Sequence, residues 1–119
     1  MDIPKAKINT AGAYIVINGL YPFAIGIKPN HGRIPIVRFG GHRQAYETGW
    51  QCAQREVYEE ANIRIRPLAT RTTYLADKAQ PEAALTQIRW GGPTYQDHTP
   101  MLVVADGRTE PASLSLMYL

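Results

Sequence analysis

The chain has 119 residues, with hydrophobic and charged fractions of 45% and 19%, which are ordinary for one globular domain. The net charge of +3 is mildly basic, but Lys and Arg form no dense run, so composition does not favour a nucleic-acid-binding protein. The single cysteine excludes an intrachain disulfide and fits a reducing compartment. No apolar run approaches the roughly 20 residues that cross a membrane, and residues 1–10 lack a signal-peptide pattern. A cytoplasmic protein without a membrane partner is the expectation.

Extended segments and turns alternate over the first forty residues. Three strands are predicted from β-branched and apolar runs, at residues 13–17, 23–27 and 34–39. Asn18 and Gly19 are predicted to begin a turn between the first two strands. Gly40 and Gly41 are predicted to end the third strand.

A helix is predicted over residues 49–61. At about 100° per residue, its apolar side chains share one face, and three glutamates occupy an adjoining sector of roughly 100°. The apolar set is Trp50, Ala53, Val57 and Ala61, and the acidic set is Glu56, Glu59 and Glu60. Asn62 follows the helix and suits the left-handed position there. Cys52 is interpreted as a packing residue, because neighbouring glutamates would raise the pKa of its thiol.

The remainder of the chain is predicted to be extended and loop-rich. Residues 63–76 read as one long strand or as two strands broken around Pro67. Residues 77–100 contain many turn residues and one short predicted strand at 85–90. Two further strands are predicted at residues 101–105 and 114–119. Strands, one helix and then more strands favour an α+β fold.

The acidic sector of the helix is locally unfavourable. Glu56 and Glu60 lie at i,i+4, where like charges repel by about 0.2–0.5 kcal/mol. Anions near a helix C-terminus also oppose the helix dipole. Such violations are expected at functional sites, and Mg²⁺ or Mn²⁺ is the natural partner, because these ions prefer carboxylate oxygen. The alternative interpretation is a solvated, charged helix end.

The spacing of these residues resembles the signature of the Nudix hydrolases. That signature is Gly, five residues, Glu, seven residues, and then Arg-Glu-hydrophobic-any-Glu-Glu-any-Gly-hydrophobic. The chain matches it at Gly41, Glu47, Arg55, Glu56, Val57, Glu59, Glu60 and Ile63. Asn62 stands where the family has glycine, and both residues tolerate the left-handed conformation.

The resemblance implies a fold. Nudix domains have a mixed, curved β-sheet with helices on both sides, so residues 1–119 would form a single Nudix domain. Such domains continue with a further strand and a second helix, so the chain would lack this C-terminal part. An apolar face or edge left uncovered favours self-association, and a homodimer is expected.

The resemblance also implies a reaction. Nudix enzymes are metal-dependent pyrophosphohydrolases in which water attacks one phosphorus of a nucleoside diphosphate linked to another moiety. By position, Glu59, Glu60 and the carbonyl of Gly41 would bind Mg²⁺ or Mn²⁺. Glu56 would be a further ligand or the catalytic base. Arg55 would hold the glutamates, and Glu47 would bind metal through water or pair with Arg55.

Other roles are less specified by the sequence. Arg38 and His42, next to the glycine turn, are candidate substrate-binding residues for phosphate, with a surface salt bridge and an exposed turn histidine as the alternatives. Asp97 is a candidate for a further acidic ligand outside the signature. A competing hypothesis is a non-catalytic Nudix-like module that binds a nucleotide. The group attached to the diphosphate is not specified by any motif.

Overall fold

The computed structural model describes residues 6–25, 36–68, 72–80, 82–90, 99–106, 108 and 113–118. In this part the chain forms one helix and eight short strands. The helix is α1 (Gly49–Ala61). The strands are β1 (Lys7–Ala13), β2 (Ala24–Ile25), β3 (Ile36–Val37), β4 (Phe39–His42), β5 (Thr73–Asp77), β6 (Thr86–Ile88), β7 (Leu102–Asp106) and β8 (Ser113–Tyr118).

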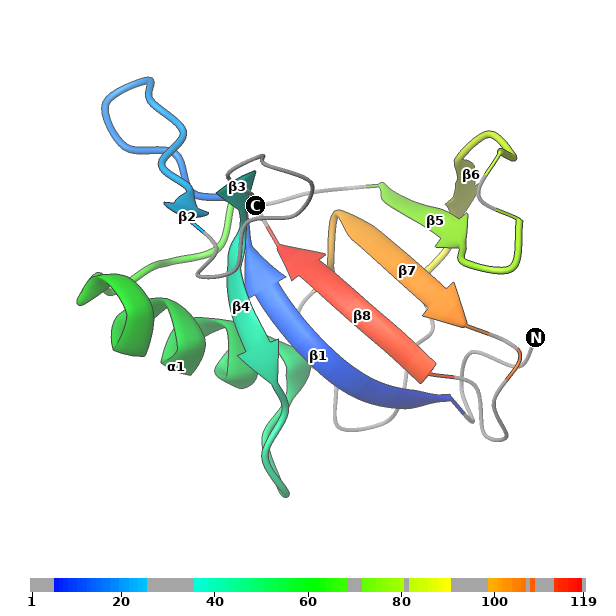
Figure 1. Ribbon diagram of the computed structural model, residues 1–119, viewed down its shortest axis with the longest axis horizontal. Helices are drawn as coiled ribbons and strands as arrows, with labels where there is room; N and C mark the ends of the chain where they lie inside the picture. The colour runs from blue at the N-terminus through cyan, green and yellow to red at the C-terminus, as the bar shows by residue number, and fades with distance from the viewer. Residues whose placement is uncertain are drawn as a thin grey trace.

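Six strands form one mixed sheet in the order β4-β1-β8-β7-β5-β6 (Figure 1). The pairs β1–β8 and β5–β7 are parallel, and the other neighbours are antiparallel. β2 and β3 form a separate antiparallel ribbon. α1 packs against β1, β4 and β8, at the β4 end of the sheet. The predicted α+β class, with a helix on a mixed sheet, is confirmed.

The core lies where α1 meets the sheet. Ile8, Val57, Val103 and Leu114 are at most 1% exposed and come from β1, α1, β7 and β8. Burying one such side chain contributes about 1.5–3 kcal/mol. The predicted apolar face of α1 is largely confirmed, since its buried residues are Gly49, Trp50, Cys52, Ala53 and Val57.

Both ends of α1 are capped by local side-chain chemistry. Thr48 Oγ1 accepts a hydrogen bond from the Gln51 amide at 3.0 Å, and Gln51 Oε1 accepts one from the Thr48 amide at 2.9 Å. This reciprocal capping box satisfies two amides that the helix leaves unpaired. Asn62 ends the helix in the left-handed region at φ 56°, and its amide donates to Tyr58 O at 2.9 Å. The predicted helix bounds and the left-handed asparagine are confirmed.

The predicted strands near the N-terminus were partly wrong. β1 covers residues 7–13, whereas the β-branched run that follows leaves the ladder after Ala13. That run leads to a bridge between Ile17 and Leu20, with the predicted Asn18-Gly19 turn between them. Gly40 and Gly41 lie within β4 and do not end a strand, because both pair with β1. β-Branched content indicated extended backbone but not which residues have ladder partners.

The segment after α1 also differs from its prediction. Residues 63–68 form no strand, although Ile63 and Ile65 pack against the core. The strand there begins only at Thr73. β6, β7 and β8 fall within or close to their predicted ranges.

Two expectations concern helices: a second helix layer on the sheet and the absence of a membrane span. In the described residues α1 is the only helix, so the second helix layer that the resemblance implies stays a prediction, as does the homodimer. No helix in that part of the chain has the length and apolar character needed to span a bilayer.

Thr48→Ala is expected to lower the free energy of unfolding by about 1 kcal/mol, because it removes the side-chain acceptor of the capping box. Urea denaturation followed by circular dichroism measures this change. Thr72→Ala, outside any helix or strand, is the matched control. Equal denaturation midpoints for the two variants would show that the cap contributes nothing.

Candidate functional site

The Arg55 guanidinium gathers carboxylates from two parts of the chain. Its Nε and Nη2 donate to Glu47 at 2.7 and 3.1 Å. Its Nη1 donates to Glu56 at 2.9 Å and to Glu59 at 3.2 Å, and Nη2 also donates to the His42 carbonyl at 2.9 Å. The pKa of Arg55 is raised, chiefly by its hydrogen bond to Glu47. The pairing of Glu47 with Arg55, one of the two roles expected for Glu47, is present.

The turn between β4 and α1 brings Glu47 to Arg55. Tyr46 is fully exposed and left-handed at φ 67°, a conformation that costs about 1–2 kcal/mol for a residue with a Cβ. The Gln44 amide donates to Glu47 Oε1 at 2.7 Å, and Arg43 donates to the Glu47 backbone carbonyl at 2.8 Å. The pKa of Glu47 is lowered, mainly by the hydrogen bond from Arg55. Glu47 is therefore a fixed negative charge at neutral pH.

Gly41 allows the Glu56 carboxylate to lie directly against β4. A Cβ at Gly41 would collide with all three atoms of the Glu56 carboxyl group. Gly41 pairs with Ala11 of β1, so both residues lie on the sheet face that α1 covers. The motif glycine is therefore a steric requirement of the site, because any side chain would displace Glu56.

Glu60 lies at the open edge of the sheet. β4 is the outermost strand, and the Gly40 amide donates to Glu60 Oε1 at 2.9 Å. In an antiparallel pair the N–H and C=O of one residue point the same way, so the Gly40 carbonyl also points outward. Gly41 points toward β1, and its carbonyl accepts from the Cys52 thiol at 3.6 Å. The geometry favours Gly40, next to the predicted Gly41, as the outward carbonyl beside the carboxylates.

The donor atoms suit a hard cation. Oε1 of Glu56 and of Glu60 are bonded, whereas in the described part of the chain Oε2 of each has no hydrogen-bond partner. Two carboxylate oxygens and one carbonyl form an all-oxygen set, which Mg²⁺ and Mn²⁺ select and which water can complete. No group of three or more His, Cys, Asp or Glu is gathered to hold a metal within the described residues. Glu59 instead bonds Arg55 and is 54% exposed.

Arg38 lies on the opposite face of β4. Gly12 and Gly40 are partners in the β1–β4 ladder, and a Cβ at either would collide with Nη1 of Arg38. Burial lowers the pKa of Arg38, while Tyr14 and Glu60 are among the neighbours that raise it. The glycine pair therefore seats a cation within electrostatic range of Glu60.

One other predicted contact, that of the His42 side chain, is not brought to the carboxylates in the described structure. The alternation of side chains along β4 places the exposed His42 ring on the face away from α1. The phosphate contacts expected of Arg38 and His42 stay predictions. Asp97, the candidate further ligand, lies outside the described residues.

Cys52 is a packing residue, as interpreted from the sequence. It is fully buried beneath β4, and burial, assisted by Glu47, raises the pKa of its thiol to about 11. The thiol is therefore protonated and unreactive at neutral pH.

Two contributors to the site were missed from the sequence. The capping pair Thr48 and Gln51 has a recognisable spacing, Thr-x-x-Gln, that could have been found. Arg43 also braces the turn, since its Nε donates to the Ile8 carbonyl of β1 at 3.1 Å. No local pattern indicates this contact, because it depends on the pairing of β1 with β4.

Comparison with protein-family models, with curated proteins and with solved structures found no match for this chain. The functional assignment therefore depends on the residues and their geometry.

Glu47→Gln is expected to lower the free energy of unfolding by an amount that depends on pH. A carboxylate with a lowered folded-state pKa stabilises the fold above its ordinary pKa of 4.5, and this contribution disappears as the pH falls through the folded value. The difference in unfolding free energy between wild type and variant should be largest near neutral pH and shrink in acid. Urea titrations at a series of pH values measure it. Glu82→Gln is the control, because it removes one exposed charge elsewhere. If the difference in unfolding free energy depends on pH no more strongly for Glu47→Gln than for Glu82→Gln, the pairing with Arg55 is contradicted.

Gly41→Ala is expected to destabilise the fold by about 1–3 kcal/mol, because overpacking forces the Glu56 carboxyl group away from β4. A double-mutant cycle with Glu56→Ala tests the cause by denaturant unfolding. The cost of Gly41→Ala should fall when the Glu56 side chain is absent. Strictly additive costs would mean that the collision is not with Glu56.

Proposed function

We propose that the chain is a metal-dependent pyrophosphohydrolase of the Nudix type, acting on a nucleoside diphosphate linked to another moiety. One observation carries the proposal. The four motif glutamates, separated by up to 13 positions in the sequence, gather around Arg55 and the Gly40-Gly41 backbone. A solvated helix end would need no glycine to accommodate Glu56 and no shared guanidinium.

The proposed cofactor is Mg²⁺ or Mn²⁺, held by Glu56, Glu60 and the outward carbonyl of Gly40, with Glu59 joining from its exposed position. Such an ion neutralises the diphosphate, lowers the pKa of bound water and orients the attack. Gly41, expected from the resemblance to be the carbonyl ligand, serves in this proposal as the position that admits Glu56.

The chain's own residues then have separate tasks. Arg55 holds Glu47 and Glu56 in place and keeps their mutual repulsion low. Glu56 keeps Oε1 on Arg55, which leaves Oε2 for the ion. Arg38, seated on the glycine pair near Glu60, supplies positive charge for a phosphate oxygen. Little else is required of a protein that hydrolyses a diphosphate, because positioning and electrostatics supply most of the rate.

The second candidate is a module that binds a nucleotide without cleaving it. It is favoured by the arrangement of the glutamates in the described residues, where Arg55 bonds three of them and Glu60 bonds an amide. In that module Arg55 and Glu47 would be a structural brace alone. The two candidates differ in whether a divalent ion changes the rate of diphosphate cleavage.

Glu60→Gln is the sharpest test, because its amide oxygen can still accept the Gly40 hydrogen bond while the negative charge is lost. A panel of nucleoside diphosphate derivatives is incubated with the wild type and Mg²⁺ or Mn²⁺, and released phosphate or nucleotide is measured. The variant should lower turnover by about a hundredfold or more, with little change in unfolding free energy.

Glu82→Gln, the same substitution on an exposed glutamate outside the site, should leave turnover unchanged. Metal-dependent turnover that survives both Glu59→Gln and Glu60→Gln would refute the assignment. Calorimetric binding of a nucleotide with no turnover in any metal would select the binding module.

A further inference from the structure

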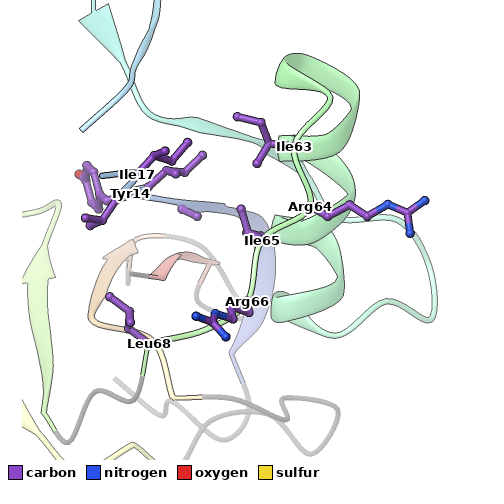
Figure 2. Close-up of a pocket in the computed structure, with 10 residues that line it drawn as sticks. Tyr14, Ile17, Ile63, Arg64, Ile65, Arg66 and Leu68 are labelled. Atoms are coloured by element: carbon purple, nitrogen blue, oxygen red, sulfur yellow. The ribbon is translucent and has the colours of Figure 1, made fainter. Parts of the chain in front are cut away.

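A cavity of about 330 Å³ lies between the end of β1 and the segment that follows α1. Figure 2 shows Ile63 and Ile65 on one side, with Tyr14 and Ile17 opposite and Leu68 at one end. The volume is at the lower end of the range of small-molecule sites, which is about 300–1,000 Å³. An apolar cavity of about 150 Å³ holds benzene, so this one has room for a two-ring group.

The cavity begins beside the proposed reaction site. Ile63 lies three residues after Glu60, directly beyond the end of α1. On the opposite side, Ala13 follows Gly12, whose ladder partner Gly40 donates to Glu60. Both walls therefore begin near Glu60, one along the chain and the other across the β1–β4 ladder.

The walls of the cavity are chiefly hydrocarbon. Ala13 and Ile15 are buried, and Ile63 and Ile65 pack against the same core. The Tyr14 ring stands edge-on to Phe23, with ring centroids 6.3 Å apart. Such surfaces favour a flat, weakly polar group over a sugar or a phosphate, whose hydroxyls and charges would lose their hydration without partners.

Two arginines line this space, and the side chain of one of them turns toward it. Figure 2 shows Arg64 extending away from the other labelled side chains, and its guanidinium lies 5.5 Å from the centre of the Tyr58 ring. Arg66 instead turns back toward Leu68, on the side of the cavity. A guanidinium has only donors, so it matches an occupant that presents ring nitrogen or carbonyl acceptors at its edge.

We propose that this cavity binds the base of the nucleotide, an inference that rests on the proposed function. The base lies between Tyr14 and the two isoleucines after α1, and Arg66 donates to an acceptor on its edge. The diphosphate then extends past Glu60 toward Arg38. The enzyme therefore recognises its substrate through the nucleoside half, and the other moiety projects outward.

Leu68→Trp and Leu85→Trp form a matched pair for the test. The two leucines are 52% and 56% exposed, and only Leu68 lines the cavity, so the first variant fills its end and the second does not. Binding of free adenosine, guanosine, cytidine and uridine is measured by calorimetry without metal. Leu68→Trp should weaken binding of the preferred nucleoside about tenfold or more, as expected from the loss of one good base contact, while Leu85→Trp binds as the wild type does.

The kinetic test separates this inference from the proposed function. With the best diphosphate substrate, Leu68→Trp should raise KM about tenfold with kcat nearly unchanged. Ile17→Trp, from the opposite wall, should act in the same direction if Leu68→Trp folds poorly. If turnover is lost in Glu60→Gln but is unchanged in both Leu68→Trp and Ile17→Trp, the cavity inference is overturned and the proposed hydrolase is not. Nucleoside binding lost in Leu68→Trp, without turnover in any variant, would keep the base site and reject the hydrolase.

Discussion

The guanidinium of Arg55 is the constraint on which the candidate site depends. α1 has no acidic residue in its first turn and no basic residue in its last turn, so its charges run against the helix dipole. Exposed ion pairs contribute only about 0–1 kcal/mol each, but this guanidinium is 22% exposed and has four acceptor groups. The contacts are partly exposed, so their effect comes from several bonds that share one guanidinium and not from any single strong pair. Because Glu47 and the His42 carbonyl lie outside the helix, the same contacts also fix α1 relative to the turn that precedes it.

Small residues on β1 and β4 make this arrangement sterically feasible. Gly41 and Ala11 face α1, and Gly12 and Gly40 face the other way toward Arg38. Each glycine in a strand costs about 0.5–1 kcal/mol relative to alanine, so local propensity does not explain them. Pairing holds β1 in place despite its small residues, since it lies between β4 on one side and β8 on the other. What the glycines gain is close approach, with a carboxylate against one face of β4 and a guanidinium against the opposite face.

The helix and its acidic sector could be predicted from the sequence, because every relevant signal is local. The 3.6-residue period, the glycine turn before the helix and Asn62 after it all lie within about twenty positions. The position of β1 could not be predicted, because its pattern is small and polar and its parallel partner β8 pairs Lys7 with Ser113. Strand pairing also decides that the Gly40 carbonyl points outward from the sheet while the Gly41 carbonyl points toward β1. Which carbonyl faces outward depends on which strand β4 pairs with, and no spacing within the motif contains that information.

The bond between Glu60 and Gly40 also has a purely structural interpretation. β4 is an edge strand, and a side chain that occupies an outward amide discourages pairing with another chain. An amide oxygen would serve that purpose equally well, so edge protection does not account for a charged residue. Charge does matter when the motif glutamates are considered together. Among the described residues, Arg55 is the only cation bonded to their carboxylates, while Arg38 acts on Glu60 and Arg43 acts on Glu47 only at longer range. Four carboxylates therefore exceed these three guanidiniums by one negative charge, so the cluster still favours an added cation.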